Sequence, residues 1–146
     1  MNIGALAPAA RERLSIVSSD APLIEAAKRL KAGLDLVAVC NSEHKLVGVV
    51  SKTDVVGRIS SCQGSSCTCA VATVMTTEVL TCSPSDSVVS VWTLMKSQAI
   101  RTVPVLDQNR RPLGIVTAGD ALQALLDETS SEEQILRDYV MGFGYR

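Results

Sequence analysis

The sequence predicts an α+β fold built from two similar repeats. Residues 14–56 align with residues 80–122 with a single one-residue slip, which indicates an internal duplication. Each copy opens with an apolar stripe at helical spacing and continues with two short apolar strands. A hydrophobic content of 47% over 146 residues is enough to build a core for such a fold.

The first element of each repeat is predicted to be an amphipathic helix. Apolar residues recur at i, i+3, i+4 and i+7 in both copies: Leu23, Ala26, Ala27 and Leu30, then Val88, Val91, Trp92 and Met95. Residues suited to a helix start precede both stripes, within Asp20–Pro22 and Ser83–Asp86. We therefore expect each helix to bury one face.

A hairpin of two strands and a short helix follow in each repeat. The predicted strands are Leu36–Cys40 with Leu46–Val50, and Val103–Leu106 with Leu113–Thr117. Because the strands are almost continuously apolar, both faces of each sheet are expected to be covered. Gly48 and Gly114 interrupt the second strand of each pair, which predicts close approach of backbone or ligand at these positions.

The end of each hairpin carries a motif that is specific when doubled. Residues 46–54 (LVGVVSKTD) and 112–120 (PLGIVTAGD) place Gly-aliphatic-aliphatic-Ser/Thr-x-x-Asp before a helix. The motif resembles the signature of the CBS (cystathionine-β-synthase-type) domain, and the tandem resembles a Bateman module over roughly residues 14 to 127. The resemblance implies two βαββα-like repeats, each a sheet flanked by helices, packed with pseudo-twofold symmetry.

We expect three segments along the chain. They are the first CBS repeat with the start of a cysteine-containing linker (10–66), the end of the linker with the second repeat (67–128), and a C-terminal helical tail (129–146). The apolar stripe of the tail, Ile135 to Val140, either packs on the module or covers a dimer partner. The resemblance also implies a flat homodimer.

The implied function is that of a regulatory module that catalyses nothing and binds an adenine nucleotide in clefts between the repeats. AMP, ADP or ATP are expected, with S-adenosylmethionine or NADH as alternatives, and no cofactor is required. A carboxylate at Asp54 or Asp120 can accept both ribose hydroxyls, and Ser51 or Thr117 offers a hydroxyl at a helix start, where phosphate is favoured. Plain helix capping explains the same Ser/Thr-x-x-Asp pattern and stays the alternative.

The two clefts differ in charge, which favours the second. The family pattern places Arg101 near the phosphates, whereas its counterpart in the first repeat is Asp35, which repels a polyphosphate. Arg101 as an ordinary solvated side chain is the alternative. The predicted second site comprises Thr117 and Asp120 for phosphate and ribose, Arg101 for charge, and Thr81, Cys82, Thr102, Val103 and Pro104 around the base. Ser51, Lys52 and Asp54 form the first site, which is empty, vestigial or specific for a less charged adenosyl ligand.

Three cysteines in the linker carry the alternative function, a metal- or redox-responsive protein. Cys62, Cys67 and Cys69 can hold zinc or a cluster with a fourth ligand, or form a Cys62–Cys67 disulfide, or simply belong to an ordinary linker. Cys40 and Cys82 lie in apolar contexts and are expected to act as small hydrophobic residues. An enzyme is disfavoured, since the lone histidine, His44, lies on a predicted turn without a catalytic set.

Charge and hydropathy disfavour two classes of partner. The 14 Lys and Arg nearly balance the 15 Asp and Glu, and no polybasic run exists, which disfavours nucleic acid. No apolar run approaches the roughly 20 residues that span a bilayer, and no basic flank follows Met1, so a cytoplasmic protein without membrane partners is expected.

Overall fold

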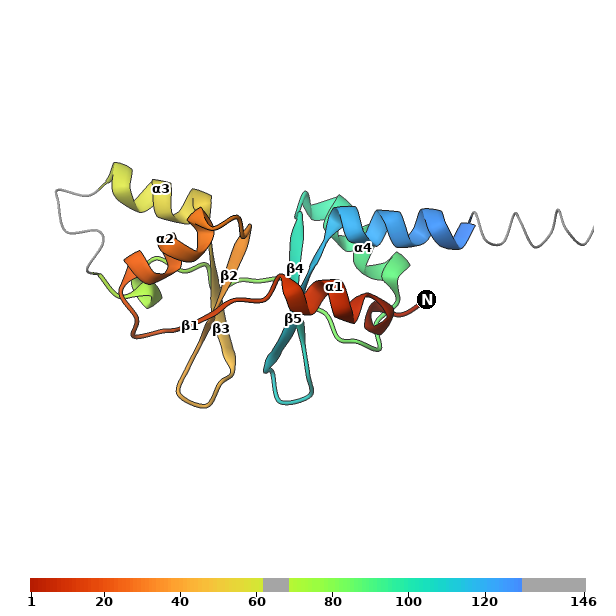
Figure 1. Ribbon diagram of the computed structural model, residues 1–146, viewed down its shortest axis with the longest axis horizontal. Helices are drawn as coiled ribbons and strands as arrows, with labels where there is room; N and C mark the ends of the chain where they lie inside the picture. The colour runs from red at the N-terminus through yellow and green to blue at the C-terminus, as the bar shows by residue number, and fades with distance from the viewer. Residues whose placement is uncertain (62–68, 130–146) are drawn as a thin grey trace, which may run out of the picture.

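The computed structural model describes residues 1–61 and 69–129 as two repeats that lie side by side (Figure 1). The first repeat comprises β1 (Ile16–Ser18), α2 (Leu23–Lys31), β2 (Leu36–Cys40), β3 (Leu46–Ser51) and α3 (Lys52–Ser60). The second comprises α4 (Val88–Gln98), β4 (Thr102–Leu106), β5 (Pro112–Thr117) and a helix over 118–129. The short helices η1 (Ile3–Leu6) and α1 (Ala7–Glu12) precede the first repeat, and η3 (Val71–Thr73) precedes the second. The predicted α+β fold is confirmed, while the apolar stripe of the tail lies outside the described residues.

The two repeats build sheets of related topology. In the first repeat, β2 and β3 are antiparallel and β1 pairs parallel with β2. In the second, β4 and β5 are antiparallel, but the strand equivalent to β1 is reduced to one parallel bridge between Cys82 and Val105. Ser19, just after β1, donates its N–H to the Cys40 carbonyl at 2.9 Å, and the equivalent position is Pro84, which has no N–H to donate. The missing donor shortens this strand.

The helices cover the sheets with the predicted apolar stripes. The buried members are Leu23, Ala26 and Leu30 of α2, and Val88, Val91 and Met95 of α4. Both helices begin at the first residue of the predicted stripe, Leu23 and Val88, but the caps differ from the prediction. Pro22 is the N-cap of α2 without a side-chain bond, and Ser87 caps α4 by accepting from Ser90 N–H at 3.5 Å. A separate cluster that includes Leu36, Ala38, Leu106 and Ile115 joins the sheets of the two repeats.

The segment before each repeat packs on the sheet of the other repeat. Thr76, which precedes the second repeat, exchanges backbone hydrogen bonds with Val49 of β3 at 2.8 and 3.0 Å. Helix α1, which precedes the first repeat, lies against β5 of the second (Figure 1). The two repeats are therefore joined by a reciprocal exchange of their leading segments as well as by a shared core.

The two strand glycines make this exchange possible. A Cβ atom at Gly48 would lie 2.7 Å from Met75 Sδ and 2.9 Å from the Thr76 carbonyl oxygen. A Cβ atom at Gly114 would lie 2.7 Å from the backbone carbon of Ala10. The close approach predicted at both glycines is confirmed, and the approaching group is the exchanged segment.

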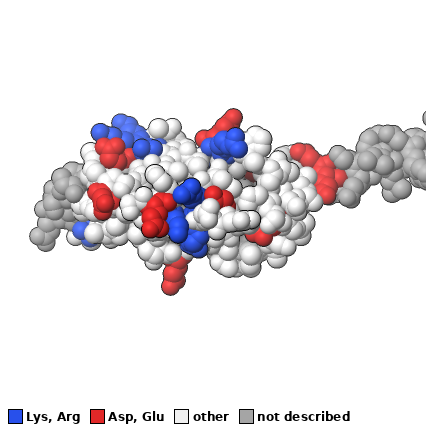
Figure 2. Space-filling view, turned by 90° about the horizontal axis from the view of Figure 1, so that it is seen from below, with Lys and Arg blue, Asp and Glu red and all other residues white. Residues whose placement is uncertain are grey.

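The hairpin turns repeat the duplication in detail. Asn41 Oδ1 accepts the N–H groups of Glu43 and Lys45, and Asp107 Oδ1 accepts those of Asn109 and Arg111. His44 and Arg110 occupy equivalent positions with φ of 66° and 64°. On the face seen from below, which carries these turns, basic side chains lie beside acidic ones (Figure 2).

Substituting Gly114 by alanine is expected to lower the free energy of unfolding by about 1–3 kcal/mol, because the new methyl group overlaps backbone atoms of Ala10 that cannot rotate away. Gly57→Ala is the matched control, since no atom lies within 4 Å of a Cβ at this exposed position of α3. It is expected to raise stability by roughly 0.5–1 kcal/mol through helix propensity. Urea unfolding measures both, and a Gly114→Ala protein as stable as the wild type would contradict the packing of α1 on β5.

Candidate functional site

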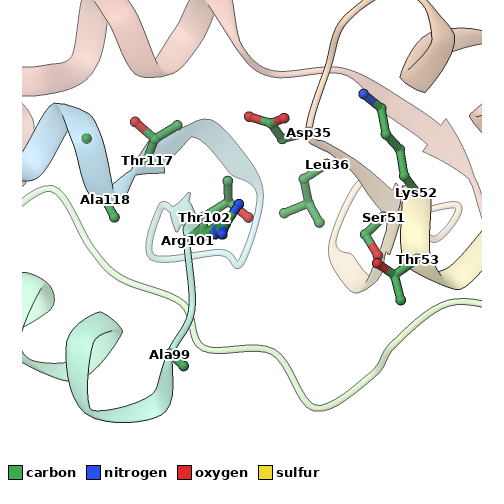
Figure 3. Close-up of a pocket in the computed structure, with 11 residues that line it drawn as sticks. Asp35, Leu36, Ser51, Lys52, Thr53, Ala99, Arg101, Thr102, Thr117 and Ala118 are labelled. Atoms are coloured by element: carbon green, nitrogen blue, oxygen red, sulfur yellow. The ribbon is translucent and has the colours of Figure 1, made fainter.

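A cavity of about 780 Å³ lies between the two repeats. Its lining residues are Asp35, Leu36, Ser51, Lys52 and Thr53 from the first repeat, and Ala99, Arg101, Thr102, Thr117, Ala118 and Gly119 from the second. In the close-up, Ser51, Lys52 and Thr53 lie on one side and the labelled residues of the second repeat on the other, with Asp35 and Leu36 between them (Figure 3). The repeats therefore form one shared cavity.

The lining is made of residue pairs that the duplication relates. The equivalent pairs are Asp35 with Arg101, Leu36 with Thr102, Ser51 with Thr117, Lys52 with Ala118, and Thr53 with Gly119. The members of two pairs differ in charge. Asp35 of the first repeat corresponds to Arg101 of the second, and Lys52 corresponds to Ala118. Each repeat thus supplies one cation to the cavity, Lys52 from the first and Arg101 from the second.

Two helix N-termini also open toward this cavity. Ser51 is the N-cap of α3, and Thr117 Oγ1 accepts the Asp120 N–H at 3.0 Å at the start of the helix over 118–129. The first N–H groups of a helix and its dipole favour an anionic group. Together with the two cations, these termini make the cavity suited to a phosphate, with Asp35 as the opposing charge.

Asp54 is held by its own helix start. Its Oδ2 accepts from the backbone N–H of Ser51 at 2.9 Å and from the Ser51 hydroxyl at 3.1 Å, which completes a capping box. Its Oδ1 accepts from the Thr76 hydroxyl at 3.2 Å. All three donors are neutral groups of Ser51 and Thr76, so no cation in the described structure is paired with this carboxylate.

Asp120 occupies the equivalent position but has a different partner. Arg13 Nε and Nη2 donate to its two carboxylate oxygens at 2.9 and 3.0 Å, a bidentate ion pair. The side chains are 41% exposed for Arg13 and 24% exposed for Asp120. Arg13 lines a small adjoining cavity of about 30 Å³ together with Asp35, Thr102 and Thr117. Asp120 therefore lies behind the lining residues Arg13 and Thr117, to which it is hydrogen-bonded.

The structure brings five of the predicted site residues to the cavity, namely Ser51, Lys52, Arg101, Thr102 and Thr117. Asp54 and Asp120 lie directly behind them through the bonds described above. Val103 and Pro104 are fully buried inside β4, and Cys82 is buried beside them with its N–H bonded to the Pro104 carbonyl oxygen at 3.0 Å. Thr81 lines a separate groove of about 210 Å³ beside α4. Contact of the last four with the base stays a prediction.

The cysteines of the described chain are thiols with modest accessibility. Burial raises the pKa of Cys82 to about 12, with a further contribution from the Asp86 carboxylate, and burial also raises the pKa of Cys40. Cys69 is half-buried against the core of the first repeat. Cys62 and Cys67 lie outside the described residues, so the predicted metal or disulfide loop stays a prediction. Within residues 1–61 and 69–129, no cluster of three His, Cys, Asp or Glu side chains is arranged to hold a metal ion.

Sequence reasoning missed several residues of the site. Leu36 and Ala118 are the equivalents of the predicted Thr102 and Lys52, so the duplication could have found them. Thr53 and Gly119 form a pair of which neither member was predicted. Ala99, with φ of 54°, ends α4 at the position equivalent to Gly33, where φ is 111°. Arg13 has no signal in the sequence, because it precedes the duplicated segment and reaches a partner far along the chain.

Comparison with known protein families identifies both halves of the chain. The model of the CBS domain family matches residues 9–61 and 71–127. The CBS domain-containing protein CBSX3 of Arabidopsis thaliana, a mitochondrial protein, is 30% identical over 115 residues, which cover 77% of this chain and 55% of that protein. A 17.7 kDa protein of Acidianus ambivalens is 28% identical over 119 residues, or 81% of this chain and 71% of the relative. The chain thus spans little more than half of the plant relative.

Solved structures share the fold. CBSX2 in complex with AMP has a TM-score of 0.73 and 24% identity, and the match covers 88% of this chain and 98% of that one. The CBS domain pair of MJ0100 in complex with 5′-methylthioadenosine and S-adenosyl-L-methionine has a TM-score of 0.72 at 24% identity, with the same coverage. Among the described residues, 1–61 and 69–129, no helix combines the length and the apolar character of a bilayer-spanning segment.

Proposed function

This chain belongs to the CBS-domain family, and we propose that it is a non-catalytic regulatory module that binds an adenine nucleotide in the cavity between its two repeats. The observation that carries the proposal is the composition of the cavity wall. The two repeats together supply two helix N-termini, two cations and hydroxyl groups to one space of about 780 Å³. These are the groups that a nucleotide phosphate requires.

The second repeat is proposed to provide the main contacts. Thr117 and Arg101 line the cavity and are assigned to the phosphate, since a hydroxyl at a helix start and a guanidinium both donate to phosphate oxygens. Asp120 is assigned to the ribose hydroxyls. Its carboxylate is not part of a capping box, unlike that of Asp54, so its engagement with a ligand leaves the helix start intact.

The first repeat is proposed to play the smaller part. Lys52 adds a positive charge to the cavity, but Asp35 on the same side opposes it. Asp54 already accepts three hydrogen bonds from Ser51 and Thr76. We therefore propose one nucleotide per chain, bound chiefly by the second repeat.

The ligands of two structural neighbours support the choice of an adenine compound. CBSX2 was solved with AMP, and the MJ0100 pair with 5′-methylthioadenosine and S-adenosyl-L-methionine. The three ligands share an adenosine moiety and differ in charge. The arginine and lysine of the present cavity favour a phosphate-bearing ligand, AMP, ADP or ATP, over a cationic sulfonium.

We also propose that two copies of the chain associate through the last helices of the repeats. Val56 and Ile59 of α3 are 65% and 59% exposed, and Leu122 and Leu126 of the helix over 118–129 are 41% and 53% exposed. Exposed apolar clusters of this kind mark interaction surfaces. Because the two helices are equivalent within the duplication, a second copy can meet them with the same pair in a twofold interface. Ligand binding then acts on a partner protein or on this assembly.

The nucleotide site is tested by thermal unfolding with AMP, ADP, ATP, S-adenosylmethionine and NADH. AMP at 100 times its dissociation constant is expected to stabilise the protein by about 2.7 kcal/mol. Asp120→Asn is expected to remove most of this stabilisation, because an amide cannot accept from both ribose hydroxyls as a carboxylate does.

Asp54→Asn is the matched control for the nucleotide site. It weakens a capping box and is expected to lower basal stability by about 0.5–2 kcal/mol while leaving the AMP shift in place. No shift with any of the five compounds, or an equal loss of the shift in both variants, contradicts the proposed site.

The dimer is tested by light scattering during gel filtration. The wild type is expected at twice the 15.5 kDa chain mass, and Val56→Glu with Leu122→Glu is expected to be monomeric, because charges would be buried in the interface. Val89→Glu with Leu94→Glu places the same charges on exposed positions of α4 and should leave the dimer intact. A monomeric wild type, or dissociation by the control pair, would show that this surface is not the interface.

A further inference from the structure

We infer that Arg13 determines the specificity of the nucleotide site: it competes with the ribose for Asp120 and, once displaced, contributes to binding of the phosphate. This role rests on the proposed function and extends it to a residue outside the duplicated segment. Arg13 is the C-cap residue of α1, and α1 packs on β5 beside the site.

The ion pair occupies the atoms that the ribose needs. Nε and Nη2 of Arg13 lie 2.9 and 3.0 Å from Oδ2 and Oδ1 of Asp120, so each carboxylate oxygen already has a charged donor. A ribose that places two hydroxyls on Asp120 meets this guanidinium first. Binding of the ribose therefore requires Arg13 to shift or to share the carboxylate.

The pair is suited to exchange because it is partly exposed. The Arg13 side chain is 41% exposed and the Asp120 side chain 24% exposed, so water screens their charges. Breaking this ion pair therefore costs little free energy. Asp54 shows the contrast, since its carboxylate is fixed by Ser51 and Thr76 within the fold itself. Among the described helix-start acids, Asp120 is therefore the one held by a charged side chain from outside its repeat.

The surroundings of Arg13 provide it with a second position. It lines the small adjoining cavity with Thr117 and Asp35, which also line the main cavity. A displaced guanidinium can thus meet a phosphate bound beside Thr117. A ligand with a phosphate compensates the lost ion pair, whereas a neutral nucleoside does not. Arg13 therefore selects for phosphate-bearing ligands.

Calorimetric titration of the full chain with adenosine and with AMP tests this role. Arg13→Gln is expected to bind adenosine about fivefold more tightly, because its competitor for Asp120 is gone. It is expected to bind AMP no more tightly than the wild type, because the phosphate loses a cation, so the preference for AMP over adenosine falls about fivefold or more. Arg13→Lys keeps the charge without the bidentate geometry and should retain most of the AMP preference.

Arg29→Gln is the matched control, since the Arg29 guanidinium donates to Ser15 Oγ at 2.6 Å on the exposed side of α2 and lines neither cavity. It should leave both affinities unchanged. Wild-type affinities for both ligands in Arg13→Gln, or an equal loss of both, would overturn the role of Arg13 and leave the nucleotide site standing. If neither adenosine nor AMP binds to any of the proteins, the wild type included, the proposed function is overturned and this role with it.

Discussion

The reciprocal packing of each leading segment on the opposite repeat is the contact on which the rest of the structure depends. Gly48 and Gly114 have no side chain, so Met75 with Thr76 and Ala10 can lie directly on β3 and β5. Each repeat alone would expose part of its sheet, because the covering segment belongs to the other half of the chain. The exchange fixes how the two repeats face each other, and the cavity between them is a consequence of that orientation.

Function is proposed to arise where the two copies differ within this symmetric frame. The duplication places equivalent positions on opposite sides of one cavity. A substitution in one copy therefore makes the two sides of the cavity differ in charge. Asp35 and Arg101 are one such pair, and Lys52 and Ala118 are another. The two helix-start acids, Asp54 and Asp120, are identical in sequence and differ in their partners. Asp54 is engaged in capping, whereas Asp120 is held by Arg13, which lies outside the repeat. Asp54 is thus bound within its own helix start, and the helix start of Asp120 is the one that we propose binds a ligand.

Most of the fold followed from the sequence because the signals were local. The predicted strand Leu36–Cys40 has the observed bounds, and the other three differ by one residue at one end, since continuous apolar runs bounded by polar turns leave little choice. Helix α1 was missed because six residues outside the duplication carry no clear period. Arg13 pairs with a residue 107 positions away, which no local pattern encodes. Val103 and Pro104 are buried within β4, while Thr102 at the start of the strand lines the cavity, so their expected contact with a base stays a prediction.

A crystal structure of the chain with AMP tests the central claim most directly. The account predicts one AMP in the cavity between the repeats, with its ribose hydroxyls within hydrogen-bonding distance of Asp120 and its phosphate beside Thr117 and Arg101. AMP bound elsewhere, for example in the groove that Thr81 lines beside α4, or a cavity left empty at saturating AMP, would contradict it.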